Sequence, residues 1–308
     1  MWVQNPQNGI SNNPDSHAST KPDESLLTLH AAVSEVHLIF TVRDKQGHYV
    51  RGLKQGDFEI LDDRKPPERI LSFRSETDLP LQVGLLIDIS QSVRKRFTFE
   101  QEAAIAFLDQ TLRRNYDQAF VTGFDITPKV TQDFTDDIGR LAVGIHLLQP
   151  GSLTAMYDAV YYACHKLLKQ SQRSPVRRVL ILLSDGYDNS SSVTRERVIE
   201  TAQWAEVLVY TIRTSLTASG RGQKNLETIA EATGGRSYVP TQIAGVANAF
   251  TAIQTELRSQ YAVSYKPTAF KLDGHYRTIE VQTPNEKGLR IRSRTGYRTA
   301  KIGSESDP

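Results

Sequence analysis

The sequence contains a single cysteine, Cys164, among its 308 residues. One cysteine excludes a disulfide within the chain and a zinc site built from cysteines. Cys164 lies in the pattern AVYYACHKLL, where its apolar neighbours favour a small buried hydrophobic residue. We therefore assign it no role in chemistry.

Long apolar runs and an excess of charge of one sign are also missing. No stretch approaches the roughly 18 apolar residues of a membrane span. The 37 basic residues nearly balance the 35 acidic ones, for a net charge of +2. This balance gives no reason to expect nucleic acid or an anionic membrane as the main partner.

The amino-terminal stretch, residues 1–30, has neither a basic start nor an apolar segment, so no signal peptide is visible in it. It is rich in Asn, Ser, Pro and Asp, and we expect a disordered tail there and at residues 301–308. The same composition fits a tail that remains after a signal is removed or a start codon is misassigned. The location of the protein is therefore open at this point.

Sequence signatures of common enzyme classes are absent. There is no Walker A stretch and no Gly-x-Gly-x-x-Gly, and there is no Gly-x-Ser-x-Gly nucleophile elbow. None of the seven histidines belongs to a recognisable nucleophile–base pair, and His146 and His165 lie in helical patterns that are typical of packing or surface residues. We predict that the protein is not an enzyme.

What the sequence does contain is a change of pattern along the chain. Residues 31–78 and 262–300 hold short β-rich runs separated by turn residues. Residues 79–261 alternate apolar strands with helical stretches, which is typical of a mostly parallel sheet covered on both faces. We predict a doubly wound α/β domain, with a small β-sandwich-like domain formed by the two flanking segments together, since the ends of an inserted domain often lie close together.

Polar side chains follow three of the predicted elements. Asp88, Ser90 and Ser92 lie at and just after the end of the strand 81–89, Thr154 opens a helix after a glycine-containing loop, and Asp185 follows the strand 177–184. Ligand sites in doubly wound sheets form beyond the carboxyl ends of the strands. Two carboxylates and three hydroxyls, without His or Cys, suit a hard cation such as Mg²⁺ or Mn²⁺.

Each of these features also has an ordinary structural explanation. Asp88 with Ser90, or Thr154, is a plausible helix N-cap, and the Ser-Asp-Gly at 184–186 is a plausible turn. Their joint placement at the expected strand ends favours a metal site over these alternatives.

The sequences LIDISQSV, GSLTAMYDAV and VLILLSDGYDN resemble the metal ion-dependent adhesion site (MIDAS) of von Willebrand factor type A (VWFA) domains. The flanks, including FTVRDKQGHYVRGLKQGDFEILDD and LRSQYAVSYKP, resemble a bacterial group of such domains known mainly from Acidobacteria. The resemblance implies a Rossmann-like α/β fold over about 81–261, and it favours an extracytoplasmic location, periplasmic or secreted.

Carried over by position, the resemblance implies that Ser90 and Ser92 bind the metal directly. Thr154 would bind directly or through water, and Asp88 and Asp185 would act mainly through water. An Asp or Glu side chain of a partner protein would complete the coordination. Gln91 departs from the family, in which glycine is frequent, and a glutamine side chain at this position could shade the metal and limit the access of a ligand.

Other residues near these loops are candidates for a rim that contacts the partner. They are Gln91, Arg94, Lys95, Arg96, Tyr187 and Asp188. The three cations either attract an acidic partner or form a solvated helix start. Asp125 has a supporting role at the site or a turn role. Arg290, Arg292 and Arg294 alternate along 289–298, where a charge-protected edge strand is a simpler explanation than a nucleic-acid surface.

We therefore predict a protein-binding module for adhesion or assembly that captures an acidic residue of its partner through bound Mg²⁺. The alternative from another class is a Mg²⁺-dependent phosphoester hydrolase, and a third possibility is a structural role with a vestigial site. The sequence leaves the oligomeric state open.

Overall fold

The computed structural model describes residues 35–75, 79–90, 97–151, 153–170, 176–215, 220–242, 244–286 and 288–299. The predicted tails lie outside the described residues, and so do the predicted site residues Gln91, Ser92, Arg94, Lys95 and Arg96. The elements that position the remaining candidates belong to one unit that begins at Glu35.

The central sheet takes its strands from the apolar runs of the middle of the sequence. Its described strands are β4 (Leu81–Asp88), β5 (Gln118–Phe124), β6 (Pro128–Thr135), β7 (Arg177–Ser184), β8 (Val207–Arg213) and β9 (Ser237–Tyr238), in the order β6-β5-β4-β7-β8-β9. All neighbouring pairs are parallel except β5 with β6. β4 is buried along its whole length, as expected for a strand covered on both faces.

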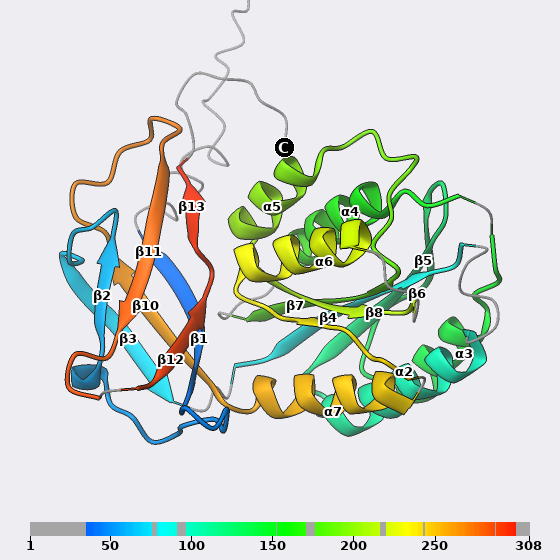
Figure 1. Ribbon diagram of the computed structural model, residues 1–308, viewed down its shortest axis with the longest axis horizontal. Helices are drawn as coiled ribbons and strands as arrows, with labels where there is room; N and C mark the ends of the chain where they lie inside the picture. Colours follow the sequence, from blue (N-terminus) through cyan, green and yellow to red (C-terminus); the bar gives the residue numbers. More distant parts are fainter. Residues whose placement is uncertain are drawn as a thin grey trace, which may run out of the picture. The chain divides into compact units, whose positions relative to one another are not determined.

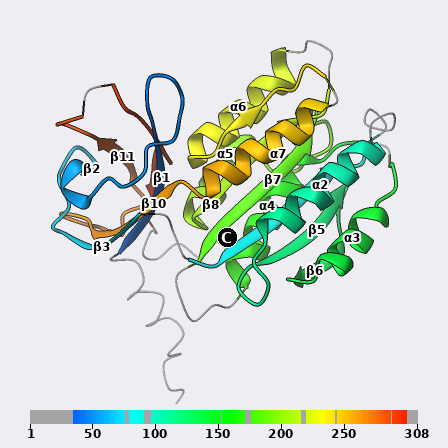
Figure 2. The ribbon, with the colours of Figure 1, turned by 90° about the horizontal axis from the view of Figure 1, so that it is seen from below.

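Helices cover both faces of this sheet (Figures 1 and 2). One core packs the sheet against α2 (Phe97–Thr111), α3 (Ile138–His146) and α7 (Ala244–Leu257), and the other packs it against α4 (Met156–Lys169), α5 (Arg195–Trp204) and α6 (Gly220–Thr233). Because side chains alternate along a strand, Val83, Leu85 and Ile87 of β4 enter the first core and Leu86 enters the second.

The two flanking segments form antiparallel sheets together. Their strands are β1 (Val36–Arg43), β2 (Glu59–Asp62), β3 (Arg69–Ser75), β10 (Gln260–Lys266), β11 (Tyr276–Gln282), β12 (Arg290–Ser293) and β13 (Gly296–Arg298), and a short 3₁₀ helix, η1, spans Gln55–Asp57. Within the described residues one sheet has the order β12-β1-β10-β3 and the other β13-β11-β2. The predicted fold class is confirmed, and the domain boundaries stay a prediction.

The sheets of this β part enclose an apolar core with one buried carboxylate. Phe40, Tyr261 and Val263 belong to the core. The carboxylate of Asp62, at the end of β2, accepts a 2.6 Å bond from Arg277 Nε and bonds of 2.9 Å from the hydroxyls of Tyr265 and Tyr297. A buried charge is tolerated when it is paired and hydrogen-bonded, and Asp62 meets both conditions.

A second buried carboxylate, Glu256 of α7, connects the β part to the α/β part. It accepts hydrogen bonds from Tyr49 Oη at 2.6 Å on one side. On the other side it accepts from Arg236 Nε at 3.1 Å and from Tyr210 Oη at 3.2 Å. The last helix of the α/β part is thereby tied to the loop after β1.

The predicted charged edge strand is only partly correct. β12 is an edge strand among the described strands and Arg290 is exposed. The strand ends at Ser293, however, and Arg294 is buried: its guanidinium donates to Gln203 O at 2.9 Å and to His37 O at 2.8 Å. The charge-protection interpretation is wrong for Arg294, because backbone carbonyls of both parts of the molecule bind it.

No helix in the described part of the chain is both long and apolar enough to span a lipid bilayer.

Candidate metal-binding site

Asp88 is the last residue of β4, and its side chain is fully buried. Oδ1 accepts from the backbone N–H of Ser90 at 2.9 Å, and Oδ2 accepts from the hydroxyl of Ser184, the last residue of β7, at 2.7 Å. The described part of helix α2 begins at Phe97. The described hydrogen bonds of the Asp88 carboxylate go to Ser90 and Ser184, and none goes to that helix.

The surroundings of Asp88 disfavour its ionised form. Burial raises the pKa of the carboxyl to about 6; hydrogen bonds from Ser90 and Ser184 oppose the rise, and the negative charge of Asp185 adds to it. Within the described part of the chain, Asp88 has no ion-pair partner. A buried carboxylate with a second carboxylate nearby is an environment that a divalent cation would stabilise.

Thr154 lies in the loop between α3 and α4, and this loop is fixed from two sides. Gly151 donates its N–H to Ile89 O at 2.5 Å, and Ala155 donates to Asp125 O at 2.6 Å. The first residue flanking α4 is Ala155, which makes no side-chain cap bond. Thr154 is therefore not the N-cap of α4, and its side chain is buried.

Asp185 follows β7 in a tight turn. Its Oδ1 accepts from the backbone N–H of Tyr187 at 3.0 Å, so the turn interpretation is correct as a local description. Gly186 has a φ of +84°, and a Cβ there would collide with the carbonyl of Gly222 in α6. Only glycine combines this conformation with so close a backbone approach.

The loops that carry Thr154 and Asp185 are joined by reciprocal hydrogen bonds. Thr154 N donates to Asn189 Oδ1 and Asn189 N donates to Thr154 O, each at 3.0 Å. Asp188 Oδ1 accepts from Tyr157 N at 3.2 Å and from the Ser191 hydroxyl at 2.5 Å. This oxygen of Asp188 therefore anchors the loop to α4.

Ser184 and Asn189 are positioning residues that the sequence analysis did not identify as such. Ser184 is fully buried and joins Asp88 to the N–H of Gly186, which its hydroxyl accepts at 3.1 Å. The sequence holds a signal for it, because a hydroxyl ends the apolar run RRVLILLS directly before Asp185. Asn189 lies in a loop without periodic pattern, so its partner cannot be read from spacing.

Asp125, after β5, supports the Thr154 loop. Its carbonyl binds Ala155 N, and its carboxylate accepts a 2.9 Å bond from Lys129 Nζ. Burial alone raises the pKa of Asp125, but the bonds from Lys129 and from Thr127 N outweigh it and leave the pKa below its usual value. Asp125 is thus neutralised by a cation of the chain, whereas no such cation pairs with Asp88 among the residues that the structure describes.

The structure brings Asp88, Ser90, the Thr154 loop and Asp185 to the carboxyl ends of β4 and β7, as the sequence predicted for their elements. Of the predicted rim, Tyr187 is 42% exposed. Ser92, Gln91 and the cations at 94–96 are not described.

The residues present fit a hard divalent cation by their chemistry. No group of three or more His, Cys, Asp or Glu side chains arranged to hold a metal occurs within the described ranges. The described donors are instead two carboxylates with serine and threonine hydroxyls, all oxygens, which are the ligands that Mg²⁺ and Mn²⁺ prefer.

The cysteine and the two helical histidines serve packing or lie on the surface. Cys164 is buried in α4, where burial raises the pKa of its thiol to about 12. His165 packs edge-on against Tyr161 with the rings 4.5 Å apart, and His146 binds Glu102 Oε1 at 3.1 Å on the surface. The predicted packing and surface roles of these three residues are confirmed.

Comparison with known proteins connects this fold to one family. The model of the von Willebrand factor type A domain matches residues 83–187, a range that includes all five predicted metal residues. No curated protein is similar enough in sequence to be matched.

Solved structures resemble the chain in fold. A von Willebrand factor type A protein from Catenulispora acidiphila is 12% identical with a TM-score of 0.52, and the match covers 88% of this chain and 75% of that one. Proximal thread matrix protein 1 from the mussel byssus, described with a zinc-occupied MIDAS motif, is 15% identical with a TM-score of 0.51, and the match covers 63% of this chain and 49% of that one. Residues 83–187 thus match the von Willebrand factor type A family, and the likeness to these solved structures is one of fold.

Proposed function

We propose that this protein is a metal-dependent protein-binding module. Asp88, Ser90, Ser92, Thr154 and Asp185 would hold Mg²⁺ or Mn²⁺, and the metal would take a carboxylate from an Asp or Glu of a partner protein. The observation that carries the proposal is the buried Asp88 carboxylate, whose partners in the described residues are neutral donors while the charge of Asp185 acts on it.

In this proposal, residues around the metal-binding loops orient the metal ligands and neutralise nearby charge. Ser184 and the N–H of Ser90 orient Asp88, and Asn189 orients the Thr154 loop relative to the Asp185 loop. Asp125 and Lys129 neutralise each other, so they hold the Thr154 loop without competing for the metal. The bound ion would supply the positive charge that attracts an anionic ligand.

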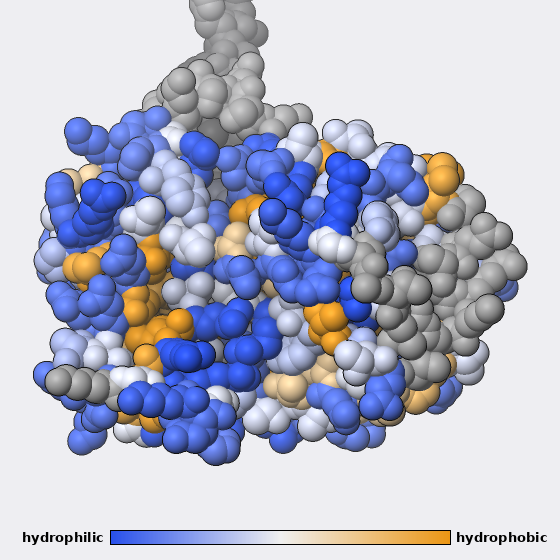
Figure 3. Space-filling view, viewed as in Figure 1, coloured by the Kyte–Doolittle hydropathy of each residue, from blue (hydrophilic) through white to orange (hydrophobic). Residues whose placement is uncertain are grey.

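The hydrophilic character of one face of the molecule is in keeping with capture by polar groups. The face shown in Figure 3 is mostly hydrophilic, and its apolar residues form separate small patches. Single exposed apolar residues are normal on a protein surface, whereas large contiguous patches mark apolar interfaces. A carboxylate-directed contact needs no large apolar patch.

The zinc-occupied MIDAS motif of the byssus protein supports a divalent ion at the corresponding loops here. We propose Mg²⁺ or Mn²⁺ because the described donors are all oxygens, and zinc belongs in the test as a competitor. An extracytoplasmic location stays part of the proposal.

Metal binding is tested first, by isothermal titration calorimetry and thermal unfolding of the EDTA-treated protein with Mg²⁺, Mn²⁺ and Zn²⁺. At a concentration 100 times Kd, a ligand of the folded state alone adds about 2.7 kcal/mol to the free energy of unfolding. We expect Asp185→Ala and Ser90→Ala to lose this gain. Asp109→Asn, an exposed acid on α2, is the matched control and should retain it.

Partner capture is tested next, by pull-down with wild type, Ser90→Ala and Asp109→Asn, each with and without EDTA. Proteins captured by wild type and by the control in Mg²⁺, but not by Ser90→Ala or in EDTA, support the proposal. Capture that survives both Ser90→Ala and EDTA contradicts it, and so does metal-dependent hydrolysis of phosphoesters that Asp88→Ala abolishes.

A further inference from the structure

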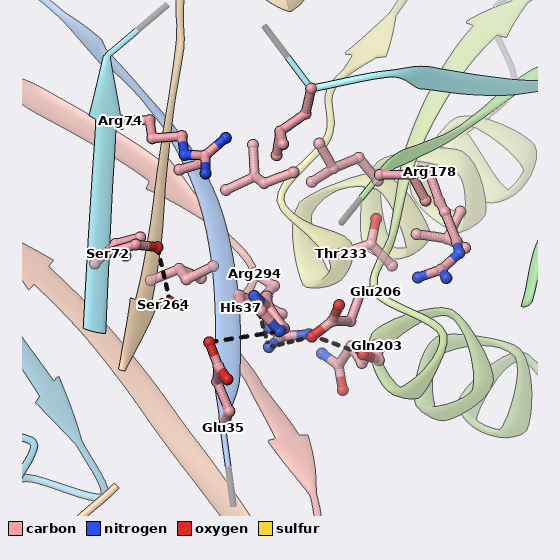
Figure 4. A pocket seen from close by; sticks show the side chains of 18 of the residues that line it. Glu35, His37, Ser72, Arg74, Arg178, Gln203, Glu206, Thr233, Ser264 and Arg294 are labelled. Atoms are coloured by element: carbon pink, nitrogen blue, oxygen red, sulfur yellow. Dashed lines mark hydrogen bonds and ion pairs between the residues drawn. The ribbon is translucent and has the colours of Figure 1, made fainter. Parts of the chain in front are cut away.

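A cavity of about 600 Å³ lies at the end of the central sheet opposite to the metal-binding loops. Its lining comes from β1, β3 and β10 on one side and from β7, α5 and β8 on the other, all within the unit that begins at Glu35. Figure 4 shows the labelled side chains around it. This volume is within the range of small-molecule sites, which often lie between two packed parts of a protein.

The floor of the cavity is the outer face of the sheet β12-β1-β10-β3. Ser72 and Ser264 are cross-strand neighbours whose hydroxyls lie 2.8 Å apart, and Ala262 lies opposite Arg74. These small side chains leave the space that larger residues would fill. Apolar residues also line the floor and walls of the cavity: Ile39, Leu71, Leu79, Val176, Val207 and Leu208.

Among the described residues that line the cavity, three arginines outnumber two glutamates, which leaves an excess of positive charge. Glu206 lies 3.8 Å from Arg294, and Glu35 lies 3.8 Å from His37. Two further arginines, Arg74 of β3 and Arg178 of β7, line the cavity from its two sides (Figure 4).

Neither of these two arginines is neutralised by an ion pair in the described part of the chain. The side chain of Arg74 is exposed and makes no hydrogen bond there. Arg178 donates only a long, 3.4 Å bond to the carbonyl of Ala205. Burial lowers the pKa of Arg178, and the charge of Glu206 opposes this effect. The cavity thus combines apolar walls with guanidinium groups suited to an oxyanion.

We propose that this cavity binds a small amphipathic carboxylate, with its hydrocarbon body against the apolar walls and its carboxylate toward Arg74. Arg178 adds positive potential from the opposite side. The occupant is a free small molecule, because the charge and the apolar lining match one anionic group on an apolar body. The proposal is independent of the metal site, since no residue is shared between the two.

The probes are octanoate, decanoate and dodecanoate, titrated into the full-length protein below their micelle concentrations, with decanol as the uncharged analogue of decanoate. Affinity should rise about fourfold for each added methylene, because each buried methylene contributes about 0.8 kcal/mol. Decanoate should bind at least about tenfold more tightly than decanol, since a carboxylate gains a charge-assisted hydrogen bond.

Charge reversal at Arg74 tests the anionic end. Arg74→Glu should weaken decanoate binding by about tenfold or more and leave decanol binding unchanged. Arg69→Glu is the matched control, because Arg69 is an exposed arginine of the same strand that does not line the cavity. Equal weakening by the two variants, or no binding of any carboxylate by wild type, overturns the proposal.

Filling the cavity tests the place of the apolar end. Ala262→Phe should abolish binding of both decanoate and decanol, with folding checked by circular dichroism. If that variant does not fold, Ser72→Phe, at an exposed position of β3, replaces it. Undiminished decanoate binding by a folded filling variant places the ligand elsewhere and overturns the proposal.

Discussion

The carboxyl edge of the central sheet and the core of the β part each bury an aspartate, but the two aspartates have different partners. Asp62 of the β part accepts from the guanidinium of Arg277 and from two tyrosine hydroxyls. Asp88 accepts from a backbone N–H and a serine hydroxyl, and the charge of Asp185 raises its pKa further.

This difference separates a carboxylate used for stability from one available for binding. Arg277 of the chain itself compensates the negative charge of Asp62, so this aspartate needs no bound cation. Among the described residues Asp88 is buried without a compensating cation, which costs folding free energy at neutral pH. Proteins retain costly groups of this kind mainly at functional sites. The comparison predicts effects of opposite sign at the two positions.

The largest expected effect is at Asp62. Asp62→Asn leaves the guanidinium of Arg277 buried beside a neutral group, which costs about 3–5 kcal/mol of the free energy of unfolding. Urea unfolding followed by circular dichroism measures it, with Glu280→Gln on the exposed side of β11 as the control. A loss below about 1 kcal/mol, the range of surface ion pairs, would break the comparison.

A smaller effect, of opposite sign, is expected at Asp88 in EDTA. The pKa of about 6 in the folded protein exceeds the ordinary value of 3.8, so the folded state binds the proton more tightly than the unfolded chain. The contribution of Asp88 to stability is therefore lost as pH rises from about 4 to above 6, by about 3 kcal/mol in all.

The comparison of wild type with Asp88→Asn isolates this contribution from that of the other carboxylates. Without metal, the free energy of unfolding of Asp88→Asn should increase relative to that of wild type as pH rises through this window. The variant should be the more stable protein at pH 7. Saturating Mg²⁺ should remove the difference by stabilising wild type alone. If the free energies of unfolding of wild type and Asp88→Asn change in parallel from pH 4 to 7, the charge of Asp88 is already compensated by another group of the protein, and the prediction is wrong.

The smallest effect on stability is expected at Tyr187, on the predicted rim. Its side chain is 42% exposed, so Tyr187→Ala should change the free energy of unfolding by less than about 0.5 kcal/mol. If the rim contacts the partner, the same change weakens capture in the pull-down while Mg²⁺ binding stays as in wild type. Loss of Mg²⁺ binding in this variant would move Tyr187 from the rim into the site itself.

Sequence reasoning identified the elements of the central sheet because their signal is local. The apolar runs of β4 and β7 and the polar residues that end them are adjacent in the chain. Parallel strands then bring their carboxyl ends to one edge by topology alone. Thr154 lies on neither strand and was recognised from its place at a helix start after a glycine-containing loop. The family motif added its expected role as a metal ligand.

The parts that could not be predicted depend on contacts between distant residues. Arg294 continues the alternation of β12 in sequence, yet its guanidinium binds carbonyls of α5 and β1. Asn189 and Ser184 were not recognised as positioning residues for the same reason. Their partners, Thr154 in the loop before α4 and Asp88 at the end of β4, are distant from them in sequence. Hydrogen-bonding capacity is visible in a sequence, but the partner across the fold is not.

The pairing of β1 with β10 sets the order in which the protein can fold during synthesis. Val36 lies opposite Tyr265, and β3 pairs with the other side of β10. The ribosome must therefore complete the whole α/β part before the amino-terminal strands find their partner. Until then the apolar side chains of β1, among them Leu38 and Phe40, stay without their core, and such strands are prone to misassembly. A chain stalled or cut before Gln260 would therefore contain the α/β part, but its β1 would lack its partner strand β10.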